Sequence, residues 1–285
     1  MHSRNRHQNR YDLKLLIKAT PELSHYVSIN QHGSETIDFA HPEAVKILNR
    51  ALLKSFYGID HWDIPKDYLC PPVPGRADYV HTIADLIGVK SGATVRVLDI
   101  GTGANCVYPL IGNAEYKWSF VGSDVDKTAV MNAEKIINDN RLQDIEIRLQ
   151  KGKNIFSGII FEGEKFTLSM CNPPFHASAE EANVGSIRKW KNLGKGIKGL
   201  NFGGKSNELW TEGGEKKFVT DMIQESALFK DQCLWFTTLV SKETNLPLYE
   251  KTLKALLPLE VRILPMEQGQ KKSRVLAWRF QHTCG

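Results

Sequence analysis

The chain has 285 residues, of which 41% are hydrophobic and 24% charged, and its formal net charge is +5. No apolar run approaches the roughly 20 residues that a membrane-spanning helix needs. These values exclude membrane, fibrous, disordered and disulfide-rich secreted proteins. The five cysteines lie far apart and form no Cys-x-x-Cys pair, so we expect a reducing, cytoplasmic location and no metal site.

Residues 1–75 are polar and rich in turn formers, and they end in a proline-rich segment. A proline at a helix start and apolar residues at helical spacing predict a helix over 42–54. The same spacing predicts a second helix over 77–88, which a glycine ends. We therefore expect a helical N-terminal extension, residues 1–75, followed by a catalytic domain formed by residues 76–285.

After residue 93, strands alternate with helices along the chain. This alternation predicts a doubly wound α/β fold with a mostly parallel sheet, which binds its ligand at the carboxyl ends of the strands. Seven strands are predicted, at 95–100, 118–122, 145–149, 166–170, 233–240, 259–264 and 274–280. Helices are predicted around 107–111 and at 126–140, 215–229 and 247–257.

A glycine-rich loop joins the first of these strands to the next helix, with the sequence Asp99-Ile-Gly101-Thr-Gly103-Ala-Asn105. Glycines let the backbone turn tightly and let a ligand approach the main chain. A dinucleotide fingerprint needs a third glycine where this chain has Cys106, so the loop favours an adenosyl ligand without a pyrophosphate, such as S-adenosylmethionine. Asp124 ends the next strand and can accept hydrogen bonds from ribose hydroxyls. The alternative interpretation is a plain turn and a helix-capping aspartate.

The tetrapeptide Asn172-Pro173-Pro174-Phe175 follows the fourth predicted strand, at the edge where ligands bind. Two prolines remove two backbone donors and stiffen the loop. The loop then offers mainly acceptors, the Asn172 side-chain oxygen and the Pro173 carbonyl, which match the two N–H groups of an amine such as N6 of adenine. Phe175 can stack on the base, worth roughly 1–3 kcal/mol. The alternative is an ordinary proline-rich turn.

Methyl transfer to an aromatic amine needs this arrangement of acceptors. The lone pair of such an amine is delocalised into the ring, and two acceptors that hold its hydrogens favour a pyramidal nitrogen. The reaction then depends on alignment and electrostatics. No strong general base is required, because the product ammonium is acidic enough to lose its proton.

Further motifs are spread over the chain: Arg4-Asn-Arg-His7, Thr36-Ile-Asp-Phe39, Asp63-Ile-Pro65, Pro72 to Tyr79, Gly103 to Leu110, Leu200 to Gly204, Glu212-Gly-Gly-Glu215 and Gln268-Gly-Gln270. With the tetrapeptide, they closely resemble the bacterial 23S rRNA adenine-N6 methyltransferases that mark adenine 1618. They are also similar to the eukaryotic methyltransferase-like-16 proteins. The resemblance implies a Rossmann-like class I fold that uses S-adenosylmethionine, with 23S rRNA or a large-subunit assembly intermediate as partner.

The resemblance also implies which residues form the site. Asn172, Pro173, Pro174 and Phe175 would hold the target adenine. The S-adenosylmethionine site would be lined by Arg76, Asp99, Gly101, Gly103, Asn105 and Asp124. Asn154 matches a position near the cofactor, where the eukaryotic relatives have threonine.

Two basic segments are candidates for contact with RNA phosphates. The N-terminal arm contributes Arg4, Arg6 and Arg10. The segment 182–207 has six basic residues, no acidic residue and six glycines, and its candidates are Arg188, Lys189, Lys191, Lys195 and Lys198. The alternative interpretation of either segment is a solvated stretch kept soluble by its charge.

These observations together predict an enzyme that methylates N6 of adenine 1618 in 23S rRNA. The same acceptor geometry also suits another RNA, DNA adenine or a protein glutamine. A rival of another class is a ribosome-assembly factor that binds RNA and has no turnover.

Overall fold

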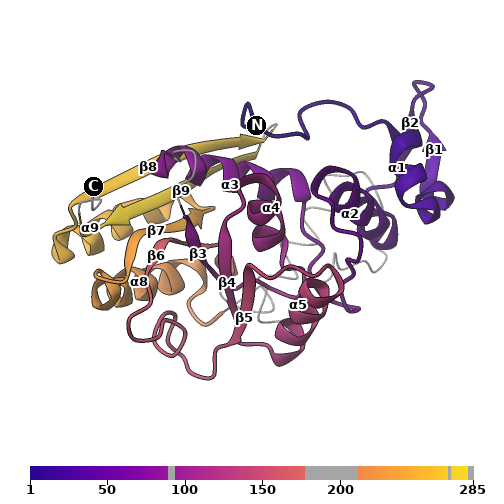
Figure 1. Cartoon of the computed structure of the whole chain (residues 1–285). Helices are drawn as coiled ribbons and strands as arrows, with labels where there is room; N and C mark the ends of the chain where they lie inside the picture. The colour runs from indigo at the N-terminus through magenta and orange to yellow at the C-terminus, as the bar shows by residue number, and fades with distance from the viewer. Residues whose placement is uncertain (89–93, 177–210, 269–270, 282–285) are drawn as a thin grey trace.

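The computed structural model describes residues 1–88, 94–176, 211–268 and 271–281. A seven-stranded sheet with the strand order β5-β4-β3-β6-β7-β9-β8 crosses the molecule (Figure 1). Its first four pairings are parallel, and β9 runs antiparallel to both β7 and β8. The predicted mostly parallel sheet is therefore confirmed. The strands are β3 Arg96–Ile100, β4 Ser119–Asp124, β5 Ile145–Leu149, β6 Phe166–Cys171, β7 Cys233–Val240, β8 Glu260–Gln268 and β9 Lys271–Arg279.

Helices cover both faces of this sheet, and each face has its own hydrophobic core. One core contains α2 (Pro42–Tyr57), α3 (Val73–Ile87), α4 (Val107–Tyr116) and α5 (Lys127–Asp139); the other contains α8 (Gly214–Ser226) and α9 (Leu246–Leu256). Val97 and Leu98 are neighbours in β3, both fully buried, and they belong to opposite cores. A strand buried on both faces reads as a continuous apolar run, which is why these strands were predictable.

The N-terminal region contains more than the predicted helix. A short helix α1 (Leu13–Ala19), a 3-10 helix η1 (Pro21–Tyr26) and a two-stranded hairpin of β1 (Val27–Ile29) and β2 (Glu35–Ile37) precede α2. The hairpin projects at one end of the molecule (Figure 1). These elements are too short to show a hydrophobic period in the sequence.

The helix predicted over 77–88 begins four residues earlier, at Val73. The proline-rich segment supplies its start, since Pro72 is the N-cap and a proline occupies the first turn. The predicted boundary after residue 75 consequently falls inside α3. Residues on both sides of it, such as Leu16, Leu52 and Ala277, pack into a single core. The division into residues 1–75 and 76–285 stays a prediction, and the segment 182–207 lies outside the described residues.

Strands β8 and β9 extend farther toward their connection than predicted, because the register of the hairpin continues from Glu260↔Arg279 to Gln268↔Lys271. Backbone pairing extends this ladder beyond the apolar pattern that marked the strands in the sequence. In the described ranges no helix is long and apolar enough to cross a membrane. The same ranges contain no group of three or more His, Cys, Asp or Glu side chains able to hold a metal.

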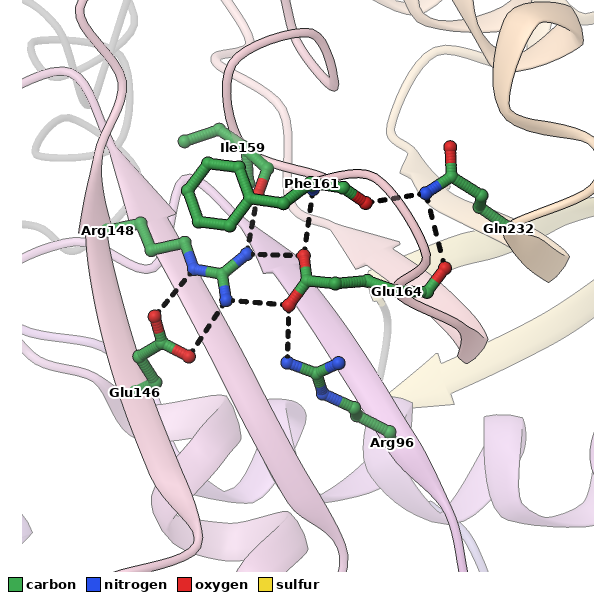
Figure 2. A network of polar contacts seen from close by, with 7 residues as sticks. All are labelled: Arg96, Glu146, Arg148, Ile159, Phe161, Glu164 and Gln232. Atoms are coloured by element: carbon green, nitrogen blue, oxygen red, sulfur yellow. Dashed lines mark hydrogen bonds and ion pairs between the residues drawn. The ribbon is translucent and has the colours of Figure 1, made fainter.

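A network of ion pairs ties the loop after β5 to the sheet (Figure 2). Arg148 makes a two-pronged contact with Glu164, at 2.7 and 2.8 Å, and Arg96 donates to the same carboxylate at 2.8 Å. Arg148 also donates to both oxygens of Glu146, at 2.7 and 2.9 Å. The Arg148 guanidinium, more than any other group, lowers the pKa of Glu164 to about 2. This network stabilises the loop that leads from β5 into β6.

Candidate active site

Four parallel strands, β3 to β6, end at the same edge of the sheet, where a cavity of about 920 Å³ lies. Chain order reverses between β3 and β6, and doubly wound sheets bind ligands at such a reversal. The strand ends and the loops that follow them contribute Gly101, Asp124, Gln150, Asn154, Asn172 and Pro174 to the lining, and α8 with the residues before it contributes Thr211, Lys217, Phe218 and Glu225.

The glycine-rich loop wraps around the end of β4. Gly101 and Gly103 have φ values of +72° and +65°, which side chains disfavour. The backbone N–H of Gly101 donates to the Ser123 carbonyl at 2.9 Å, and the N–H of Gly103 donates to Asp124 Oδ2 at 2.9 Å. Asn105 Oδ1 accepts from the Val107 N–H at 3.1 Å. The loop therefore presents its backbone to the cavity in a fixed shape.

Asp124 is oriented by two backbone donors. Its Oδ2 accepts from Gly103 and its Oδ1 accepts from the Asp126 N–H at 2.9 Å. Burial raises the pKa of this carboxyl above its usual value. The N-cap of α5 is Asp126, whose side chain accepts from Thr128 and Ala129, so the alternative of a helix-capping Asp124 is wrong. Asp124 lines the cavity and keeps lone pairs for a ligand.

Asp99 lies beneath the glycine-rich loop and is fully buried. Within the described ranges, neither of its carboxylate oxygens has a hydrogen-bond partner. Burial raises the pKa of Asp99 to about 7. Among the described residues, those that line the two cavities at this edge of the sheet do not include Asp99. In this respect Asp99 differs from the other residues implied for the cofactor site.

A second, smaller cavity of about 70 Å³ adjoins the first and shares Gly101, Asp124, Asn172 and Pro174 with it. Its wall also includes Arg76, Gly103, Asn105 and Tyr108. The Arg76 guanidinium donates to the Tyr108 hydroxyl at 2.8 Å and lies 5.4 Å from the centre of that ring. The structure thus brings Arg76, 23 positions before Asp99 in the sequence, to the glycine-rich loop.

The tetrapeptide lies between the two cavities. Asn172 and Pro174 line both of them, whereas Pro173 is buried and Phe175 is partly buried without lining either. The side-chain oxygen of Asn172 is buried and has no hydrogen-bond partner among the described residues. Below it, the N–H of Cys171 approaches the Tyr79 hydroxyl at 3.4 Å. The orientation of Asn172 therefore leaves an acceptor unsatisfied at the cavity wall.

Sequence reasoning missed the residues that hold the glycine-rich loop from behind. Trp62 is buried, and its Nε1 donates to the Asn105 carbonyl at 2.9 Å. Asn132 of α5 donates to the carbonyls of Asp63 and Ala104, at 2.9 and 2.7 Å. These contacts join the N-terminal region to the site, and the Asp63-Ile-Pro65 motif was the one sequence signal for them.

The predicted RNA-binding arginines of the arm differ in their surroundings. Arg4 pairs with Asp85 at 2.5 Å, and Arg6 pairs with Glu115 at 2.7 Å, so both contact helices of this chain. Arg10 is exposed and donates to Ser34 Oγ at 3.1 Å. The remaining candidates, Arg188, Lys189, Lys191, Lys195 and Lys198, lie outside the described residues.

Comparison with known proteins agrees with this geometry. A profile of a family described as "RNA methyltransferase" matches residues 1–282. The ribosomal RNA large subunit methyltransferase F of Pseudomonas fluorescens (strain Pf0-1) is 58% identical over 294 residues, which cover 99% of this chain and 86% of that protein.

Two crystal structures of human METTL16, one of its catalytic domain and one of its N-terminal domain, are also similar. The complex with the MAT2A 3'UTR hairpin 1 has a TM-score of 0.87 and 32% identity, covering 99% of this chain and 96% of that one. The complex with SAH has a TM-score of 0.80 and 29% identity, covering 99% of each chain. The profile match and the identity to methyltransferase F show that this chain belongs to the RNA methyltransferase family.

Proposed function

We propose that the protein transfers the methyl group of S-adenosylmethionine to N6 of adenine 1618 in 23S rRNA. One observation carries the proposal: a buried acceptor, Asn172 Oδ1, lies without a described partner on the wall shared by the two cavities. A buried acceptor left unsatisfied costs about 1–3 kcal/mol. The N–H of an exocyclic amine would remove that penalty, and Asn172 would select such a group.

The residues around the cavities fit S-adenosylmethionine, which supplies an electrophilic methyl group on a sulfonium when bound. Asp124 would accept hydrogen bonds from the ribose hydroxyls, and Gly101 and Gly103 would permit close approach of the ligand to the backbone. Arg76, in the wall of the smaller cavity, would bind the carboxylate group of S-adenosylmethionine. The cavity of about 920 Å³ is within the usual size range of ligand pockets and leaves space for a target base.

Three further residues would complete the donor site. The Asp99 carboxylate lies behind the cavity walls and would favour the ammonium group of the donor through its negative charge, because a buried carboxylate is stabilised by a nearby positive charge. Asn105 and Asn154 line the smaller and the larger cavity, respectively, and would contact opposite ends of the donor. The relative crystallised with SAH, the demethylated product of such a donor, supports this assignment.

The tetrapeptide would hold the target base during transfer. Asn172 Oδ1 and the Pro173 carbonyl would accept the two N6 hydrogens, and Phe175, which lines neither cavity, would turn toward the base to stack on its ring. Held in this way, the nitrogen directs its lone pair away from the two acceptors and toward the donor site. The proton leaves after transfer, so the chain needs no strong base, and its contribution is alignment.

The RNA substrate is proposed from the relatives and from the chain's charge. The relative 58% identical is named a ribosomal RNA large subunit methyltransferase, and a structural relative was crystallised with an RNA hairpin. Stacking hides N6, so the adenine would have to be unpaired or flipped out, which costs a few kcal/mol. Arg10 and the basic segment 182–207 would contact phosphates of the rRNA or of an assembly intermediate.

The test is incubation of the protein with methyl-labelled S-adenosylmethionine and, separately, with 23S rRNA, duplex DNA and total protein. We expect label in 23S rRNA alone, mapped to adenine 1618 and absent from that position in cells lacking the protein. Label in DNA or protein without label in rRNA would overturn the proposed substrate. Binding of rRNA with no transfer would favour a non-catalytic assembly factor.

A further inference from the structure

Helix α8 forms one wall of the large cavity and has a glutamate in its first turn and another in its last, Glu215 and Glu225. Neither was assigned a role from the sequence. Both carboxylates accept several hydrogen bonds from other parts of the chain. The partners differ: those of Glu215 lie between the end of β7 and α9, and those of Glu225 lie in the loop after β5.

Glu215 is 2% exposed and ties the start of α8 to the connection between β7 and α9. One of its oxygens accepts from the N–H of Ser241 at 2.9 Å and also from the Ser241 hydroxyl. The other accepts from Asn245 Nδ2 at 2.9 Å, and the Tyr249 hydroxyl, which lies 3.4 Å from it, is closer to the backbone carbonyl of Glu215, at 3.1 Å. A carboxylate with donors on both oxygens fixes the helix start in one position.

The start of α8 is in turn connected to the tetrapeptide. The N–H of Gly214 donates to the Thr211 carbonyl at 2.8 Å, and the N–H of Thr211 donates to the carbonyl of His176 at 3.1 Å. His176 directly follows Phe175 in the sequence. A shift of the helix start would therefore move the chain that leaves the tetrapeptide.

Glu225 lines the cavity and holds the loop that follows β5. Its two oxygens accept from three consecutive backbone N–H groups: Ile155 at 2.7 Å, Phe156 at 3.1 Å and Ser157 at 2.7 Å. Charged acceptors make stronger hydrogen bonds than neutral ones. Asn154, which directly precedes this group and lines the cavity, is thereby kept near Asp124 at the proposed donor site.

From these contacts we propose that α8 is a brace with separate positioning residues for the two substrates. Glu215 positions the tetrapeptide and thus the target base, and Glu225 positions the loop with Asn154 and thus the methyl donor. This inference rests on the proposed function of the site. Neither glutamate takes part in bond making; each acts through the backbone that it holds.

The experiment compares Glu215→Gln and Glu225→Gln with the wild type. An amide keeps one acceptor oxygen and replaces the other by a donor, so it cannot satisfy the donors that each carboxylate faces. Binding of S-adenosylhomocysteine is measured by calorimetry, and transfer to 23S rRNA is measured at saturating S-adenosylmethionine. Glu250→Gln, the same change at an exposed residue of α9, is the control.

We expect Glu225→Gln to weaken S-adenosylhomocysteine binding about tenfold and to leave kcat nearly unchanged. We expect Glu215→Gln to lower kcat about tenfold to a hundredfold with binding unchanged, because small misplacements cost rates of that order. Tyr249→Phe removes one donor from Glu215 without changing its charge. This variant should show a smaller loss of the same kind, even if Glu215→Gln fails to fold.

Two outcomes would overturn the inference. Equal effects of both substitutions on binding and on kcat would show that α8 only stabilises the fold, as would an unchanged kcat in Tyr249→Phe together with unchanged S-adenosylhomocysteine binding in Glu225→Gln. A wild-type protein that neither binds S-adenosylhomocysteine nor methylates rRNA would instead refute the proposed function.

Discussion

Replacing Asp99 by asparagine should stabilise the ligand-free protein at pH 8 and do so far less at pH 5. Asp99 is fully buried, and within the described ranges its oxygens have no partner. Burial raises its pKa to about 7, against 3.8 for an ordinary aspartate. The folded protein therefore holds a proton that the unfolded chain releases between these two values.

The direction of the effect follows from this difference. Asp99 does not lower the stability of the folded form below pH 3.8, and it lowers this stability progressively as the pH rises to 7. The difference between the two pKa values, 3.8 and 7, corresponds to a loss of about 4 kcal/mol in the free energy of unfolding. At pH 5 the loss is about 1.5 kcal/mol. The experiment therefore measures how much this loss increases between pH 5 and pH 8.

The assay is urea unfolding of the ligand-free wild type and Asp99→Asn at both pH values. The advantage of the variant in the free energy of unfolding should grow from pH 5 to pH 8. Asp144→Asn, the same change at an exposed residue, should show no such growth. An advantage of Asp99→Asn that is equally large at both pH values would refute the raised pKa of Asp99. The variant should also bind S-adenosylhomocysteine more weakly, because it cannot balance an ammonium charge.

Three further predictions concern stability, the glycine-rich loop and RNA binding. Arg148 lowers the pKa of Glu164 to about 2, so Glu164→Gln should lower the free energy of unfolding by roughly 3 kcal/mol at pH 7. This loss should disappear as the pH falls from 4.5 to 2, and an equal loss in urea unfolding at pH 2 would contradict the prediction. Trp62→Phe removes the donor to Asn105 and should weaken S-adenosylhomocysteine binding in calorimetry by about fivefold, or about 1 kcal/mol. Arg10→Ala should reduce the salt dependence of RNA binding by about one phosphate contact and leave the binding of S-adenosylhomocysteine unchanged. An unchanged slope of RNA affinity against salt concentration would show that Arg10 does not contact the RNA.

The sheet and the location of the site were predictable from the sequence because both depend on local patterns. Strands buried on two faces appear as short apolar runs, and the residues that end such strands meet at one edge. Gly101, Asp124 and Asn172 each directly follow or end a strand of this kind, so their convergence on one cavity could be expected. The same logic could not decide whether Asp124 caps a helix; the backbone places Asp126 in that role.

Contacts between distant parts of the chain were not predictable. The Trp62 bond to Asn105 spans 43 positions, and the Glu225 bonds to the loop after β5 span about 70. No periodic pattern marks a single side chain that meets a backbone group so far away. Arg4 and Arg6 show the same limit, because a basic arm looks free in the sequence although both side chains pair with helices of the chain.

The most direct test of the account is methyl transfer to 23S rRNA by Asn172→Ala, measured in a single turnover with S-adenosylmethionine and RNA both bound. The substitution removes the side-chain acceptor while the Pro173 carbonyl and the donor site remain. We predict that S-adenosylhomocysteine and RNA bind with affinities close to those of the wild type and that the transfer rate falls by at least about a hundredfold. A transfer rate near that of the wild type would show that Asn172 does not hold the target amine.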